Sequence, residues 1–210
     1  MPAELSAGWV AALSEAWDAY LHGSYAIGAV VVDAQGHVIA RGRNRLGEPR
    51  GAEGGVISGH DLAHAEINAL LNLSATPRPD SYGWTVLTTV QPCPQCAGAI
   101  AMSGVRGVEY AAPDPWAGCT RLLTDDEYVM KKQIRVGRAP ETVQVVALRL
   151  ALVGFMDEGH DALGPFLQTF HEHEADVQYA SRLTQGDTLA ALRDRRAPLS
   201  DALAVLGGSA

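Results

Sequence analysis

The pattern of apolar and polar positions in the first 60 residues predicts a helix followed by a β-hairpin. Apolar side chains recur at three- and four-residue spacing between residues 6 and 21, which is typical of an amphipathic helix. These positions are Trp9, Val10, Leu13, Trp17, Tyr20 and Leu21. Two apolar runs then flank DAQGH, residues 33–37, where Gly36 can supply the turn of a hairpin. The Gly-rich segment 46–60 has no hydrophobic period, so we expect a surface loop there.

Helical and extended patterns alternate from residue 61 onward. Asp61 is placed to cap a helix that continues to residue 73, and a second helix over 94–104 is opened by proline and closed by Gly104. The segments with strand patterns are WTVLTTV (84–90), GVEYAAPDP (107–115) and TVQVVAL (142–148). Alternation of this kind is typical of parallel βα units and indicates an α/β fold.

Beyond residue 150 the sequence changes to short helical stretches separated by polar breaks. We therefore expect an α/β domain over residues 1–150 and a helical C-terminal extension, residues 151–210, packed on it. With 210 residues and 47% hydrophobic composition, the chain is long enough for one well-buried domain with such an appendage.

Charge and cysteine content narrow the class of protein. The formal net charge of −8 argues against a large polyanionic partner, although Arg41, Arg43 and Arg45 alternate along one strand and could share a face. The first 40 residues contain no Lys or Arg, which argues against a secretory signal, and the apolar run over 143–156 is too short to span a bilayer. Three cysteines do not form a disulfide framework. We expect a cytoplasmic protein.

The segment PCPQC places Cys93 and Cys96 at the start of a predicted helix. Residues three apart share a helix face, so both sulfur atoms can reach one ion. The partial positive charge of the helix N-terminus favours the thiolate form that a metal needs. Alone, this spacing is ambiguous: it is found in metal sites, in redox pairs and in buried thiols without a chemical role, and a metal site is favoured over a redox pair.

The segment HAE adds His64 and Glu66 to this pair. An imidazole and two thiolates make three ligands of a tetrahedral zinc ion and leave a fourth position open for water. A carboxylate beside such a water can take its proton and pass it to a leaving nitrogen, and Glu66 is suited to this task. On a regular helix His64 and Glu66 lie about 200° apart, so one site can use both only if it covers the helix end.

HAE followed by PCPQC is similar to the H-x-E…P-C-x-x-C signature of zinc-dependent cytidine and nucleobase deaminases. The segments GRNR, CAGAIAMSGV and YAAPDPWAG resemble the branch of tRNA adenosine deaminases and bacterial guanine deaminases. The resemblance covers about residues 5–148 and leaves the helical extension outside. It implies a three-layer α/β/α fold, with a five-stranded mixed sheet between helices and zinc between two helix N-termini.

The resemblance also implies roles for single residues. His64, Cys93 and Cys96 would bind zinc, Glu66 would shuttle protons, and Asn44 would hold the base. The backbone around Ala65 would face the base edge, while Asp114 and Trp116 would line the pocket. Members of this branch commonly form homodimers, which we expect here too. Cys119 and the HEHE segment, residues 171–174, are interpreted as a bystander thiol and a solvated polar face.

The leading hypothesis is hydrolytic deamination of a free nucleobase or nucleoside, with a purine such as guanine favoured. Three alternatives stay open: a tRNA adenosine deaminase, a deoxycytidylate or cytidine-type deaminase, and a non-catalytic zinc-stabilised nucleotide-binding protein. Two departures bear on the choice. Gln91 stands where many members of the branch carry glutamate, and HAEINAL with TTVQPC is similar to deoxycytidylate deaminases.

Overall fold

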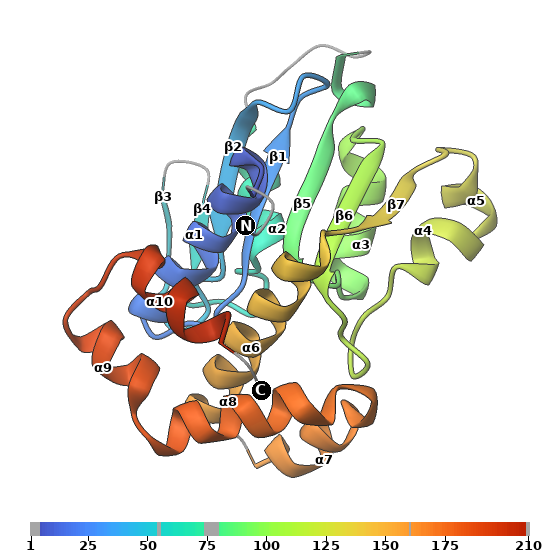
Figure 1. Cartoon of the computed structure of the whole chain (residues 1–210). Helices are drawn as coiled ribbons and strands as arrows, with labels where there is room; N and C mark the ends of the chain where they lie inside the picture. The colour runs from blue at the N-terminus through green and yellow to red at the C-terminus, as the bar shows by residue number, and fades with distance from the viewer. Residues whose placement is uncertain (1–4, 54–55, 74–79, 160, 209–210) are drawn as a thin grey trace.

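A five-stranded mixed sheet forms the centre of the protein, which we describe from a computed structural model over residues 5–53, 56–73, 80–159 and 161–208 (Figure 1). Its strands are, in spatial order, β2 (Val38–Arg43), β1 (Gly28–Val32), β5 (Thr85–Val90), β6 (Gly107–Ala112) and β7 (Arg135–Arg138). β1 runs antiparallel to both β2 and β5, whereas β5, β6 and β7 are parallel. The predicted hairpin, the parallel units and the mixed five-stranded sheet are therefore confirmed.

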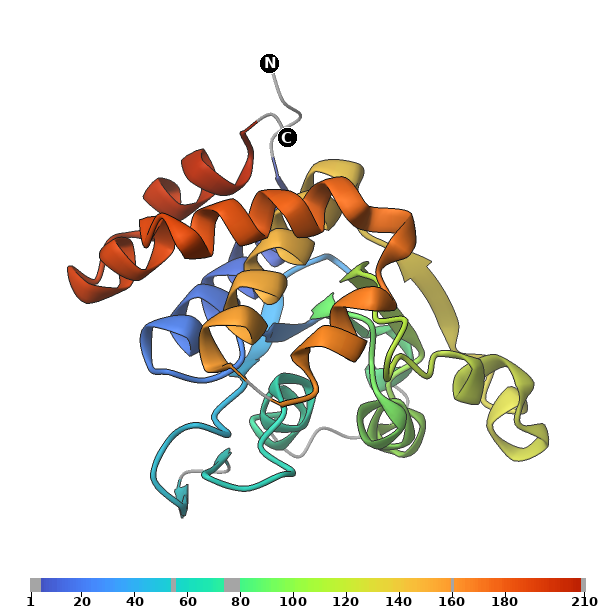
Figure 2. The same ribbon diagram turned by 90° about the horizontal axis from the view of Figure 1, so that it is seen from below.

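Helices cover both faces of this sheet, which gives the three layers expected (Figure 2). On one face lie α1 (Ala7–Leu21), which the apolar period predicted, and α6 (Glu141–Glu158). On the other lie α2 (Ala65–Leu71) and α3 (Pro94–Ser103). Alternate residues of β1 divide between the two cores: Val30 packs with the first pair of helices and Val31 with the second.

Close backbone contact seats α2 against the sheet. A Cβ atom at Gly42, in β2, would lie 2.2 Å from the Ala69 nitrogen and 2.4 Å from the Ala65 oxygen. Only glycine allows this approach of strand to helix. The start of α2 is thereby held directly above the sheet.

The strand predicted over residues 142–148 is wrong, because this segment forms the first half of α6. The helix begins after Pro140, and Val143, Ala147, Leu150 and Ala151 are buried at helical spacing. A short apolar run rich in β-branched residues does not separate a buried strand from a buried helix. The fifth strand is instead β7, whose four residues RVGR carry no hydrophobic signal.

Two local predictions around the start of α2 also differ from the structure. The helix begins at Ala65, and its N-cap residue is His64 rather than Asp61. The segment 46–60 is not wholly irregular, since β3 (Gly51–Glu53) and β4 (Val56–Ser58) pair as a small antiparallel sheet. The Asn68 side chain fixes β4 to α2 by accepting from the Ile57 nitrogen at 2.8 Å and donating to its oxygen at 3.0 Å.

Beyond β6 the chain is mostly helical. Besides α6 and β7, its elements are α4 (Arg121–Asp125), α5 (Glu127–Met130), α7 (Leu163–Gln168), α8 (Glu174–Gln185), α9 (Thr188–Asp194) and α10 (Leu199–Leu206), with a short 3₁₀ turn over His171–His173. Another 3₁₀ turn, Asp80–Gly83, precedes β5. α8 packs along α6. Residue 150 lies inside α6, so one continuous helix crosses the expected boundary, and the division into 1–150 and 151–210 stays a prediction. No helix in the described ranges is both long and apolar enough to cross a bilayer.

Arg149 anchors the C-terminal helices to α6. Its side chain is 6% exposed, and its Nε donates to Asp176 in α8 at 2.7 Å. Its Nη1 donates to the backbone oxygens of Leu206 and Gly208 at 2.8 and 2.6 Å. One buried guanidinium thus ties α6 to α8 and to the end of α10.

Candidate metal centre and substrate pocket

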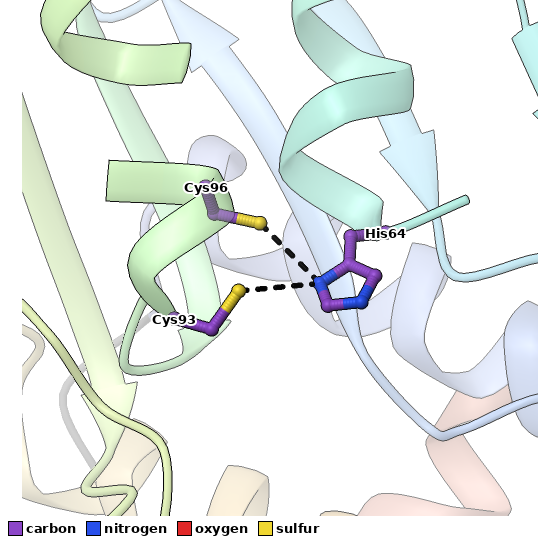
Figure 3. A group of neighbouring side chains, drawn as sticks. All are labelled: His64, Cys93 and Cys96. Carbon is purple, nitrogen blue, oxygen red and sulfur yellow. Dashed lines mark hydrogen bonds between the residues drawn. The ribbon is translucent and has the colours of Figure 1, made fainter. Parts of the chain in front are cut away.

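His64, Cys93 and Cys96 converge where the N-termini of α2 and α3 meet (Figure 3). Cys93 is the N-cap residue of α3 with Pro94 at the first helical position, and Cys96 follows one turn later. His64 holds the same N-cap position before α2 with extended backbone angles, φ −74° and ψ 154°. Within the described ranges, these three residues form the one group of three potential metal ligands, and the HEHE segment forms none.

The spacing of the three ligand atoms fits a zinc ion. The Nδ1 atom of His64 lies 3.5 Å from the Cys93 sulfur and 3.4 Å from the Cys96 sulfur. A tetrahedral zinc ion with ordinary Zn–S and Zn–N bonds places sulfur and nitrogen about 3.6 Å apart. Two thiolates and one imidazole are also the donor set of catalytic zinc sites that keep a fourth position for water. The residues present therefore fit this ion.

Contacts among the ligands shift their pKa values. The neighbouring Cys96 thiol, opposed by burial and aided by His64, lowers the pKa of Cys93 to about 4. The proximity of Cys93, together with burial and the nearby Glu66 carboxylate, raises the pKa of Cys96. The contact with Cys93 raises the pKa of the His64 imidazole, against the effect of burial. Uptake of a metal therefore releases protons from this cluster.

Glu66 lies beside the ligands and is buried, with 3% of its surface exposed. Its Oε2 accepts from the Cys96 thiol and its Oε1 from the Thr88 hydroxyl, both at 3.2 Å. Burial raises the pKa of this carboxyl, although the nearby His64 opposes the shift. A buried carboxyl with a raised pKa is suited to accept and return a proton near neutral pH.

A cavity of about 520 Å³ opens beside these residues. Of the predicted substrate-binding residues, Asn44, Asp114 and Trp116 line it together with His64, Glu66 and Cys93. Ala65 is fully buried and does not line it. Asn44 is 2% exposed, and its Oδ1 accepts from the Leu46 nitrogen at 3.0 Å, so its amide has a fixed orientation.

The loop that follows β6 is fixed by Gln91, the residue that departs from the expected glutamate. Its Oε1 accepts from the Asp114 nitrogen at 3.1 Å, and its Nε2 donates to the Thr120 hydroxyl at 2.8 Å. Asp114 Oδ1 accepts from the Trp116 and Ala117 nitrogens, which partly opposes the rise in the pKa of Asp114 caused by burial. Asp114 thus shapes its own loop at the cavity wall.

The cavity has a second set of lining residues that sequence reasoning missed. They are Tyr25 and Ile27 before β1, Phe155 in α6, and Asp161, Ala162, Leu163 and Phe166 in and before α7. Most of them lie beyond the motifs, and the prediction of a strand over 142–148 concealed the helix that carries Phe155. No local spacing signal links them to HAE or PCPQC.

The charges around the cavity are acidic or neutral. Among its described lining residues none is Lys or Arg, whereas Glu66, Asp114 and Asp161 carry carboxyl groups. The three nearby arginines have carboxylate partners. Arg43 and Arg45 both pair with Glu48, and Arg41 lies 3.9 Å from Glu15. Two carboxylates therefore pair with the three arginines and neutralise part of the charge of the expected basic face.

Comparison with known proteins points to one family. A family model described as "Cytidine and deoxycytidylate deaminase zinc-binding region" matches residues 4–112. The tRNA-specific adenosine deaminase of Bacillus subtilis (strain 168) is 38% identical over 116 residues, 53% of this chain and 64% of that protein. The tRNA(Ile)-lysidine synthase of Deinococcus radiodurans is 33% identical over 100 residues, 47% of this chain and 16% of that protein. The chain thus spans less than two thirds of either relative.

Two further similarities extend the comparison. The cytosine deaminase of Candida albicans is 27% identical over 119 residues, 57% of this chain and 73% of that protein. A crystal structure of a variant of NE0047 in complex with 8-azaguanine has a TM-score of 0.54 at 24% identity, covering 70% of this chain and 82% of that chain. This second likeness concerns the fold, and it confirms the expected three-layer arrangement.

Proposed function

Because the chain belongs to the zinc-binding cytidine and deoxycytidylate deaminase family, we propose that it hydrolyses the amino group of a free nucleobase or nucleoside. Water replaces the amine on a ring carbon, and ammonia leaves. A purine such as guanine is the first candidate substrate. The observation that carries the proposal is the buried Glu66 carboxylate beside the His64–Cys93–Cys96 cluster, at the wall of the cavity.

The residues of the site have separate roles in this reaction. His64, Cys93 and Cys96 would hold a zinc ion, which when bound would supply the Lewis acidity that activates water. Glu66 accepts a proton from the attacking water and delivers it to the departing nitrogen. The Thr88 hydroxyl holds Oε1 of Glu66, which leaves Oε2 directed toward the ligand cluster.

Asn44 and the loop after β6 position the base. The Asn44 Oδ1 atom is engaged by the Leu46 nitrogen, so its Nδ2 group is the one that can donate to a ring carbonyl or ring nitrogen. Asp114 accepts amino hydrogens from a base with the carboxylate oxygen that its own loop leaves unused. Both groups are rigidly supported, which is what orientation of a small substrate requires.

The charge of the lining supports an uncharged substrate over a nucleotide. A phosphate would meet Glu66, Asp114 and Asp161 without a described Lys or Arg on the cavity wall to pair with it. This argues against the deoxycytidylate alternative. The pairing of Arg43 and Arg45 with Glu48, together with the net charge of −8, argues against RNA as well.

A tRNA adenosine deaminase remains the second candidate, since the Bacillus subtilis relative has that specificity in its name. Ammonia release by the zinc-loaded protein separates the two. The panel comprises guanine, adenine and cytosine, their nucleosides, deoxycytidylate, and an anticodon stem-loop with an adenosine at the wobble position. We expect turnover of a base or nucleoside. Turnover confined to the stem-loop would overturn the proposal in favour of RNA, and turnover of none would favour a non-catalytic zinc protein.

A further inference from the structure

Four aromatic side chains from separate parts of the chain meet on one side of the cavity. They are Tyr25, Trp116, Phe155 and Phe166, and we call them the aromatic wall. The ring centroids of Tyr25 and Phe155 lie 4.8 Å apart, and those of Phe155 and Phe166 lie 4.7 Å apart. Trp116 meets Phe166 edge-on at 6.3 Å. These spacings are those of interacting aromatic pairs, so the wall is a connected surface.

The aromatic wall packs against a buried residue on one side and faces the cavity on the other. Phe170, which does not line the cavity, is 4% exposed and lies 5.1 Å from Phe166. Tyr25, Phe155 and Phe166 are half-buried, and Trp116 is 54% exposed. Burial and the Glu158 carboxylate raise the pKa of Tyr25 to about 12, so this ring stays neutral. Phe166 lies between the buried Phe170 on one side and the cavity on the other.

Three of the four wall residues lie beyond the family match. That match ends at residue 112, whereas Trp116 is in the loop after β6, Phe155 is in α6 and Phe166 is in α7. In the view of Figure 2, α7 projects between α6 and the helices α2 and α3, which begin at the ligand cluster. The metal ligands and α7 border the same cavity.

We propose that the C-terminal helices supply the surface that recognises the ring of the substrate, with Phe155 and Phe166 packing against a flat, uncharged heterocycle. This rests on the proposed function, because a nucleobase is the ligand whose π face such a wall fits. Stacking on aromatic side chains is tolerant of base identity. Asn44 and Asp114 would then distinguish one base from another, whereas Phe155 and Phe166 would provide affinity for the ring.

The test compares substitutions that separate the aromatic ring from apolar volume. Phe166→Leu keeps an apolar side chain, Phe166→Ala removes it, and Phe166→Tyr keeps a ring. Gln168→Ala changes an exposed residue of the same helix that does not line the cavity and serves as the matched control. All are made in zinc-loaded Glu66→Gln protein, so that guanine, adenine and cytosine can be titrated by calorimetry without turnover. Zinc content and melting temperature verify that each variant is folded.

We expect Phe166→Leu and Phe166→Ala to weaken binding of the tightest of the three bases by about five- to 150-fold. Phe166→Tyr and Gln168→Ala should stay close to the parent protein. Unchanged binding by folded Phe166→Leu protein would overturn the inference, and Phe166→Leu keeps this test decisive if Phe166→Ala does not fold. If base binding depends on Phe166 but the wild-type protein releases no ammonia, the role of the aromatic wall in binding is supported and the proposed deaminase activity is overturned. Binding of no base would overturn both.

Discussion

The Oε2 atom of Glu66 lies 3.2 Å from the sulfur of Cys96, although Glu66 is in α2 and Cys96 is in α3. This contact joins the proposed proton-transfer group, Glu66, to the candidate metal ligands. It is possible because His64 precedes α2 in an extended conformation while Glu66 lies within its first turn. The 200° separation expected on a regular helix therefore does not apply, and the helix end lets both side chains serve one site.

The ligand cluster predicts which thiols control zinc content. Cys93→Ser and Cys96→Ser each remove a soft ligand, and we expect zinc affinity to fall by more than about tenfold. Cys119→Ser is the matched control, because Cys119 is a half-buried thiol outside the cluster. Elemental analysis after dialysis against a weak chelator measures the outcome. Equal zinc loss from all three variants would contradict this ligand assignment.

Thr88 predicts a positioning effect on catalysis. Its hydroxyl hydrogen-bonds the Glu66 carboxyl from a fully buried position in β5. Thr88→Val keeps the shape of the side chain and removes the hydroxyl, and we expect kcat to fall about tenfold with KM little changed. Thr88→Ser should restore most of the rate. A Val variant with wild-type kcat, or a Ser variant as slow as Val, would show that this hydrogen bond does not position Glu66.

The buried contacts of Arg149 predict that substituting it lowers the stability of the protein strongly, although it is distant from the cavity. Arg149→Ala would leave Asp176 and the Leu206 and Gly208 carbonyls without their buried partner. We expect the free energy of unfolding in urea to fall by about 3 kcal/mol. Arg195→Ala, which removes an exposed ion pair with Asp201, should change it by less than about 1 kcal/mol. Similar losses from the two substitutions would contradict the anchoring role.

Glu48 predicts a pH-dependent contribution to stability. Burial alone would raise the pKa of this carboxyl, but hydrogen bonds from Arg45 and Arg43 outweigh that effect and lower it below its ordinary 4.5. A lowered folded pKa gives stability that is present above the unfolded pKa and is lost as pH falls through the folded one. The stability advantage of the wild type over Glu48→Gln should therefore be full at pH 6 and shrink below about pH 4.5. Urea unfolding at several pH values measures it, and an advantage independent of pH would refute the ion-pair account.

The chemistry of the site could be predicted from the sequence because it rests on short spacings. His64, Glu66, Cys93 and Cys96 fall in two motifs whose residue types predict a zinc site and a proton-transfer group, and the structure brings the four side chains together. The same local logic recovered β1, β2, β5 and β6, where apolar runs are bounded by turns. The roles of Asn44, Ala65, Asp114 and Trp116 in substrate binding stay predictions, as do the homodimer and the cytoplasmic location.

The errors have a common physical origin, which is that tertiary packing decides them. Residues 142–148 are apolar enough for a strand, but Pro140 and burial against the sheet place them in a helix. β7 is short and polar, and its pairing with β6 makes it a strand. Phe155 and Phe166 join the cavity from positions about 90 to 100 residues beyond His64, and no periodicity reports a contact of that separation.

The most direct test of the central claim is ammonia release by wild-type and Glu66→Gln protein, each loaded with equal zinc, on the best base or nucleoside of the panel. Glutamine keeps the size of the side chain but cannot carry the proton. The account predicts that the wild type turns over and that Glu66→Gln loses at least about 100-fold in kcat while still binding the substrate. Equal turnover by the two proteins would contradict the assignment of Glu66 and the mechanism built on it.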